Sequence, residues 1–187
     1  MQTTLIKGDA ATEMLKIDHR LIQSLFRQIE NTDSDRRKKM LGDRCLREIE
    51  IHSLVENKIF YPAVRRDLGE DRLVEQALMD HEAAERLVHE LKGLAEGERY
   101  NIRFRALREV FVPHIEEEEA GLLPLVEASD MDIEALGQQM LDLKLRIEPS
   151  PFVEERVRNI AAAVAGVAAV GGILWLAGRY LGGRRAR

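Results

Sequence analysis

The amino-acid sequence predicts an all-α protein: an up-down-up-down four-helix bundle with a pseudo-two-fold repeat, a short fifth helix and an apolar C-terminal helix. Hydrophobic residues make up 45% and charged residues 33% of the 187 positions, which is typical of a chain that folds. Aromatic residues are only 5% and prolines number five, which disfavours a β-sandwich. From residue 10 to residue 147 the apolar positions recur at helical spacing. The single cysteine, Cys45, excludes an internal disulfide.

Four long helices and one short helix are expected, at residues 10–31, 35–66, 70–96, 98–128 and 132–147. Either Asp33 or Ser34 can cap the second helix, and Gly69 can end it. Pro113 lies inside the fourth helix, where it predicts a local bend. The connections are short, so consecutive helices should run antiparallel in one bundle.

The C-terminal region differs from the rest, and we expect three parts: a bundle at residues 1–148, a proline-containing linker at 149–155 and an apolar helix at 156–187. Residues 160–178 contain no charge over 19 positions and are flanked by arginines. As a helix rising ~1.5 Å per residue they would reach about 28 Å, close to the hydrocarbon thickness of a bilayer. This predicts a single-pass C-terminal membrane anchor. Small residues in the segment also suit the alternative, a soluble cytoplasmic homo-oligomer that pairs these helices.

Charge is divided unevenly between the bundle and the tail. The tail from Arg156 carries six arginines and no acidic residue, whereas residues 1–155 hold 22 basic and 33 acidic residues. So acidic a bundle disfavours nucleic acid as a partner, because phosphate contacts need clustered Lys and Arg. It suits cations. Residues 1–8 lack the apolar core of a signal peptide, so the bundle is expected in the cytoplasm.

A repeated histidine–glutamate pattern carries the chemistry. Four of the five histidines fall one per long helix, and His52 and His114 are each followed four residues later by a glutamate within the repeat. A shift of 62 residues maps the first half of the pattern onto the second, including two aspartates and two prolines. The pairs are His19 and His81, His52 and His114, Glu56 and Glu118, Asp18 and Asp80, and Pro62 and Pro124. Two similar hairpins would therefore bring equivalent side chains together at the bundle centre.

Each of these side chains interrupts an apolar stripe, so the sequence predicts buried carboxylates that need a positive partner. Four imidazoles and two or three carboxylates suit two first-row divalent ions, with iron or manganese as candidates. Glu85, one turn after His81, is a further candidate ligand or a hydrogen-bond acceptor. Glu119 belongs to an acidic run expected to face solvent, and is an alternate ligand. Tyr61 is a candidate hydrogen-bond donor to the site.

At these residues the chain resembles the hemerythrin-like HHE cation-binding family over residues 10–147. The resemblance implies a four-helix bundle around a non-haem diiron centre, with carboxylate and oxo or hydroxo bridges. It implies His19, His52, His81 and His114 as terminal ligands and Glu56 and Glu118 as bridging carboxylates. Oxygen-carrying members have a histidine where this chain has Glu85, which disfavours reversible oxygen carriage.

Three functions follow as expectations. The first is an iron-dependent protein at a membrane that binds or senses O2, NO or iron itself. The second is a diiron oxidoreductase acting on peroxide, NO or ferrous iron. The third is an anchoring module in which the metal only stabilises the fold. The expected partners are accordingly a small diatomic ligand or peroxide, and the membrane.

Overall fold

The computed structural model describes residues 10–147, in which every regular element is helical. The predicted all-α bundle is confirmed for this part of the chain. The elements are α1 (Ala11–Glu30), α2 (Asp35–Val55), η1 (Glu56–Phe60), α3 (Tyr61–Leu68), α4 (Asp71–Lys92), α5 (Glu98–Glu117), η2 (Glu118–Leu122), α6 (Leu123–Glu127) and α7 (Ile133–Ile147). The second and fourth predicted helices are thus each built from three consecutive pieces.

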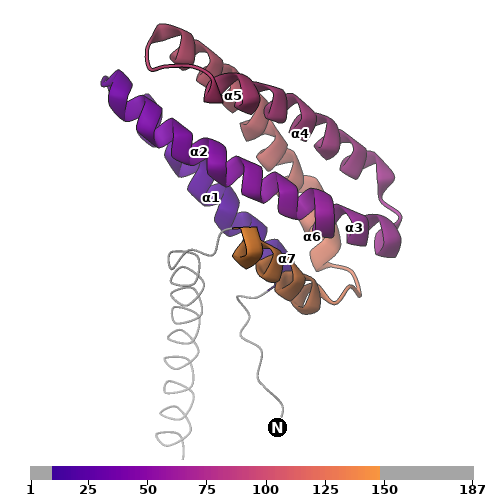
Figure 1. Cartoon of the computed structure of the whole chain (residues 1–187). Helices are drawn as coiled ribbons and strands as arrows, with labels where there is room; N and C mark the ends of the chain where they lie inside the picture. The colour runs from indigo at the N-terminus through magenta and orange to yellow at the C-terminus, as the bar shows by residue number, and fades with distance from the viewer. Residues whose placement is uncertain (1–9, 148–187) are drawn as a thin grey trace, which may run out of the picture.

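Two helical hairpins form the bundle. In the first hairpin α1 packs against α2, and in the second α4 packs against α5 (Figure 1). Helix α2 also contacts both α4 and α5, so the two hairpins share one interior. The fifth helix, α7, packs on α1, α2 and η1, which places it beside the first hairpin.

The helix ends follow the local sequence signals. The side chain of Ser34, rather than Asp33, caps α2 by accepting a hydrogen bond from the N–H of Arg37 at 3.3 Å. Gly69 ends α3 in the left-handed conformation, with φ at 64°, which a residue without a Cβ adopts at little cost. Helix α5 continues through Pro113 without a break.

Two π-helical turns, which the sequence pattern does not predict, interrupt the long helices at equivalent places. In η1 the N–H of Tyr61 donates to the carbonyl of Glu56, and in η2 the N–H of Leu123 donates to the carbonyl of Glu118. A proline follows directly in both halves. The two π turns are offset by 62 residues, so the sequence repeat is also a repeat of backbone geometry.

The apolar interior is divided into two clusters, with the polar residues of the repeat between them. One cluster is built around Phe26, Phe104 and Phe111, and the other lies between the π turns, α3, α6 and α7. Along each long helix the histidine stands where the first cluster gives way to the second. The packing on both sides therefore shields the same central layer from water.

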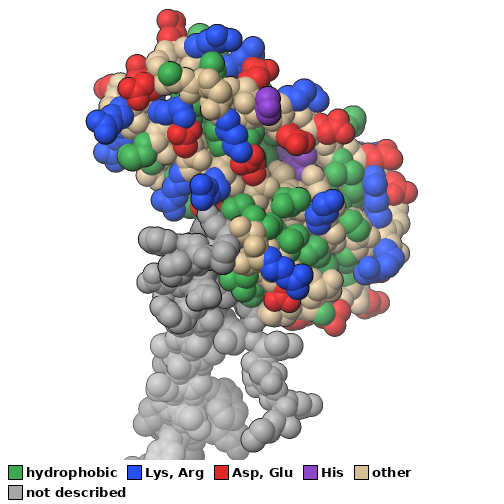
Figure 2. Space-filling view, in the orientation of Figure 1, with side chains coloured by type: hydrophobic (Ala, Val, Ile, Leu, Met, Phe, Trp, Pro, Cys, Tyr) green, Lys and Arg blue, Asp and Glu red, His purple; other side chains and the backbone are tan. Residues whose placement is uncertain are grey.

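The predicted apolar helix at residues 156–187 and the linker at 149–155 lie outside the described residues. Among residues 10–147 no helix combines the length and the hydrophobicity that crossing a bilayer requires. On the face shown in Figure 2, hydrophobic side chains gather where the end of α2 meets α7, and charged side chains cover the opposite end of the bundle.

Candidate metal centre

Six of the residues predicted as ligands meet in the central layer of the bundle. Their exposed fractions are all between 0% and 4%: His19, His52, Glu56, His81, His114 and Glu118. They come from α1, α2, η1, α4, α5 and η2, so all four long helices contribute. Burying ionisable groups to this extent is unfavourable unless the groups compensate one another or hold an ion.

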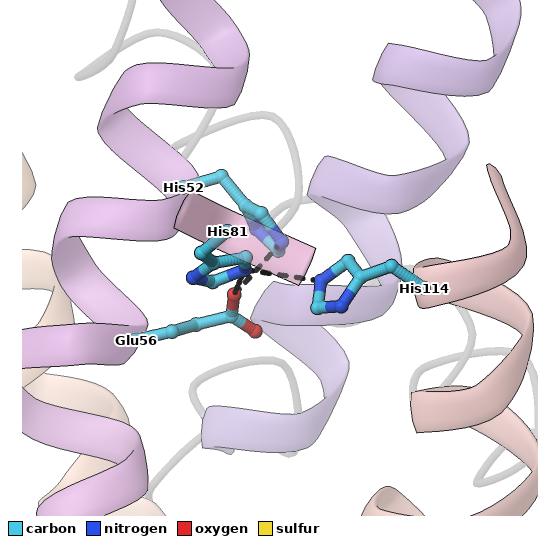
Figure 3. A group of neighbouring side chains, drawn as sticks. All are labelled: His52, Glu56, His81 and His114. Atoms are coloured by element: carbon cyan, nitrogen blue, oxygen red, sulfur yellow. Dashed lines mark hydrogen bonds and ion pairs between the residues drawn. The ribbon is translucent and has the colours of Figure 1, made fainter. Parts of the chain in front are cut away.

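Each glutamate lies between histidines of the two hairpins. Oε2 of Glu56 is 3.0 Å from Nε2 of His52 on its own helix and 3.3 Å from Nε2 of His81 on the other hairpin. Figure 3 shows these side chains converging with His114, whose Nε2 is 3.1 Å from that of His81.

The second glutamate repeats the arrangement. Oε2 of Glu118 is 3.4 Å from Nε2 of His19 and 3.7 Å from Nε2 of His114. Two carboxylates, each facing one histidine from either hairpin, are the arrangement expected of groups that bridge a pair of ions.

The other ring nitrogen of each histidine faces an acceptor at the edge of the layer. Nδ1 of His19 is 2.9 Å from the carboxylate of Glu119, and Nδ1 of His81 is 2.9 Å from the side-chain oxygen of Asn57. For the remaining two the acceptors are carboxylates at 3.7 and 4.0 Å, Asp18 beside His52 and Asp80 beside His114. A neutral imidazole whose Nδ1–H points at such an acceptor turns its Nε2 lone pair inward, the orientation a metal ligand requires.

These outer acceptors follow the 62-residue repeat as well. The aspartates were visible in the sequence as part of the repeat, whereas the correspondence of Asn57 with Glu119 was missed. Both follow a buried glutamate directly and reach back to the histidine of the opposite hairpin. The structure thus gives Glu119 a role behind His19 rather than among the central side chains.

Tyr61 breaks the symmetry of the site. Its hydroxyl donates to Oε1 of Glu118 at 2.7 Å and lies 3.4 Å from Oε2 of Glu56. Burial and the two carboxylates raise the pKa of Tyr61 well above its usual 10.0, so the phenol keeps its proton. The equivalent position in the second hairpin is Leu123. Only one side of this site therefore carries a phenolic proton donor.

Without a metal, the charges of the six side chains oppose one another. Burial lowers the pKa of His52, but the carboxylates of Glu56 and Asp18 outweigh that effect and raise the pKa to about 10. Burial favours the neutral form of Glu56, yet His52 and His81 hold its pKa well below 4.5. Burial and the charge of Glu56 raise the pKa of Glu118. The pKa values of Glu56 and Glu118 thus move in opposite directions, because the metal-free site has too little positive charge to stabilise both carboxylates in the ionised form.

Buried polar atoms without a hydrogen-bond partner point to the same lack of positive charge at the centre of the layer. Within residues 10–147 several buried atoms of this layer have no hydrogen-bond partner: Nε2 of His19, both ring nitrogens of His52, Oε1 of Glu56 and Oε2 of Glu118. Two overlapping groups could each hold an ion, and their ligand atoms lie within 4.8 Å of one another. One group is His52, Glu56, His81 and His114, and the other is His19, His52, Glu56 and Glu118. A nitrogen and carboxylate donor set of this kind fits iron or manganese.

The structure does not bring Glu85 to the site. Its side chain is exposed, and it belongs to neither group of potential ligands. On α4 the buried stripe passes through Ala84, three residues after His81, so the position four residues after the histidine turns toward solvent. On α2 and α5 the stripe instead continues through the glutamate into the π turn.

Comparison with known proteins is consistent with this geometry. Residues 10–126 match the family model described as the hemerythrin HHE cation binding domain. A crystal structure of a hemerythrin HHE cation binding domain-containing protein from Mycobacterium kansasii aligns with a TM-score of 0.64 and 26% identity, covering 83% of this chain and 98% of that one.

Two curated relatives are more distant in sequence. An uncharacterised protein of Mycobacterium tuberculosis (strain H37Rv) is 24% identical over 156 residues, which are 81% of this chain and 95% of that protein. A DNA nickase of Nostoc is 22% identical over 116 residues, which are 61% of this chain. This chain spans only 32% of the Nostoc protein, so the likeness concerns one part of it.

Proposed function

Because the chain belongs to the hemerythrin HHE cation-binding family, we propose that its central layer holds a diiron centre that binds a small diatomic ligand or peroxide. The observation that carries the proposal is the overlap of the two ligand groups, which share His52 and Glu56. A carboxylate common to both groups, Glu56, would set two ions side by side, as a bridging ligand requires. Glu56 and Glu118 would bridge, and the four histidines would be terminal ligands.

The residues of the chain have distinct tasks in this proposal. When bound, iron supplies a redox couple and an open coordination position for a small ligand. The histidines hold the ions through Nε2, and their outer acceptors fix the ring orientation. The two apolar clusters exclude bulk water from the layer. Tyr61 holds a proton 2.7 Å from Glu118, within reach of a ligand bound beside that carboxylate.

Iron analysis of the purified protein tests the centre. We expect about two irons per chain, and Glu56→Gln should reduce this to about one or fewer, because the amide is a poor bridge. Glu85→Gln is the matched control: it makes the same change on an exposed face, and iron content should not change. Equal loss of iron in both variants, or less than one iron per wild-type chain, would contradict the proposal.

Tyr61 favours a second candidate, an oxidoreductase that disproportionates peroxide to water and O2. Reduction of one peroxide takes up two protons, which oxidation of a second peroxide releases, and the phenol of Tyr61 could relay a proton within this buried site. Adding peroxide to the iron-loaded protein and measuring O2 release over many cycles separates the two. Sustained release supports the oxidoreductase, and a stable spectral change without release supports a binder or sensor. An iron-loaded protein whose spectrum responds to neither NO nor peroxide would instead be a bundle that iron only stabilises.

We also propose that residues 156–187 anchor the protein to a membrane, as the uncharged stretch at 160–178 and its flanking arginines indicate. Co-flotation with phosphatidylcholine vesicles tests this, with a chain ending at residue 155 as the control. The full chain should float and the shortened chain should stay at the bottom of the gradient. A full chain that stays at the bottom as a homo-oligomer would support helix pairing instead.

A further inference from the structure

A small pocket between α4, the end of α5 and η2 reaches the central layer from the surface. It is small, with a volume of about 20 Å³. His114 and Glu118 form part of its wall, and the exposed Gln76 and Glu117 lie at its outer side. The pocket is therefore a route from solvent to two side chains of the centre.

The equivalent place in the first hairpin is packed with buried side chains. A shift of 62 residues carries five of the eight wall residues onto the apolar cluster that α7 covers, and the other three onto Asp18, His52 and Glu56. At five positions the first hairpin has a larger or apolar side chain: Leu15 for Ala77, Met14 for Gln76, Val55 for Glu117, Phe60 for Leu122 and Ile59 for Gly121. The first four of these replacements lie at pocket-wall positions. The exception is Ala11, which stands in place of Leu73. The two hairpins thus share the ligands but differ in the packing around them.

Helix α7 completes the closure on the first side. It packs on α1 and η1, and its Lys144 is hydrogen bonded to Asp18, the partner of Asp80 in the repeat. Asp80, by contrast, accepts a hydrogen bond from the exposed side chain of Gln76, at 3.1 Å. Figure 1 shows α7 against the first hairpin, away from α4.

We propose that this pocket is the access route to the metal centre for small uncharged molecules. The inference rests on the proposed diiron function and adds the path and the selectivity of its ligand. The volume of about 20 Å³ has room for a molecule of one or two heavy atoms, since a single water needs roughly 10–15 Å³. The inner wall is apolar at Ala77 and Leu122, and carboxylates stand at Asp80 and Glu117. That charge disfavours anions and leaves neutral diatomic molecules or hydrogen peroxide unimpeded.

Two substitutions can close the route with side chains that the first hairpin already uses. Ala77→Leu copies Leu15 into the pocket wall. Gly121→Ile copies Ile59, and a Cβ at Gly121 would make ordinary contacts of 3.8 and 3.9 Å with Leu73, a wall residue. Gly121 has no positive φ, so the backbone accepts a side chain. Ala120→Ile makes a similar change on the exposed side of the same π turn and is the matched control.

The experiment is stopped-flow binding of NO to the diferrous full-length protein, followed by absorbance, with iron content and circular dichroism checked for each variant. Ala77→Leu and Gly121→Ile should slow association and dissociation together by about tenfold or more, leaving Kd unchanged, because a route alters both rates equally. Ala120→Ile should bind at the wild-type rate. Fluoride, an anion of a single heavy atom, should bind faster to Glu117→Gln than to the wild type, whereas NO should not.

The possible failures separate the two proposals. A wild-type protein that holds no iron or does not respond to NO would overturn the proposed function and the route together. Wild-type NO rates in both closing variants would overturn the route alone. A change in Kd without a matching change in both rates would show that the substitutions alter the centre itself, and would likewise overturn the route.

Discussion

Lys144 of α7 stabilises the ionised form of a carboxylate that lies directly behind the metal centre. It is hydrogen bonded to Asp18, and the two side chains are only 11% and 15% exposed. Burial alone would raise the pKa of Asp18, but Lys144 and then His52 outweigh it and lower the pKa from 3.8 to about 2. We therefore predict that Lys144→Met destabilises the metal-free protein.

The size of the effect follows from this pKa. A change from 3.8 to about 2 corresponds to about 2 kcal/mol in favour of the ionised folded form, at ~1.4 kcal/mol per pKa unit. Because Lys144 is the largest of the opposing charges, its loss should lower the free energy of unfolding by about 1–2 kcal/mol at pH 7. The folded pKa lies below the unfolded one, so this stabilisation is complete above about pH 4 and is lost as the pH falls through about 2.

Urea unfolding followed by circular dichroism, at pH 7 and at steps down to the lowest pH at which the protein is folded, measures this difference. Lys92→Met is the control, since Lys92 and its partner Glu50 are 54% and 44% exposed and such a pair contributes only about 0–1 kcal/mol. An equal loss of unfolding free energy in Lys144→Met and in Lys92→Met would refute the reasoning. So would a loss in Lys144→Met that stays constant below pH 4, because lost packing rather than lost charge would then explain it.

Three further outcomes are expected. Tyr61→Phe should lower the free energy of unfolding of the metal-free protein by about 1–3 kcal/mol in urea, because it removes a buried hydrogen bond to the carboxylate of Glu118. Iron affinity, measured by competition with a chelator, should rise with pH between 6 and 8. The pKa of His52 in the metal-free protein is raised to about 10, so its imidazole carries a proton that iron must displace on binding. Gly42→Ala should lower the free energy of unfolding by about 1–3 kcal/mol, and the melting temperature with it, although alanine has the better helix propensity. The reason is that a Cβ at this position overlaps the hydroxyl of the buried Tyr100.

The sequence was sufficient to predict the bundle and the six central side chains. Helical periodicity placed every long helix, and the repeat of 62 residues identified the histidines and glutamates as one set. Glu85 was a weaker inference, because a spacing of four residues after His81 does not say on which side of a helix the buried stripe runs. Only the packing of α4, with Ala84 inward, decides that.

The outer acceptors could not be predicted for a related reason. Asn57 and Glu119 are polar residues next to buried glutamates, and in a regular α-helix the neighbour of a buried position usually faces solvent. The 62-residue correspondence was the available signal, but the two residues differ in type, so it did not stand out. Their contacts with His81 and His19 appear only once the opposite hairpin is in place.

The π turns explain why the prolines belong to the repeat. Pro62 and Pro124 have no N–H to donate, and in a regular α-helix their rings would press on the carbonyl four residues earlier. Widening the preceding turn, so that the N–H just before each proline donates to the carbonyl five residues back, accommodates the ring without ending the helix. The carbonyls that accept these bonds belong to Glu56 and Glu118. Each proline therefore fixes the backbone of a buried glutamate, which couples helix geometry to the candidate metal site in both hairpins.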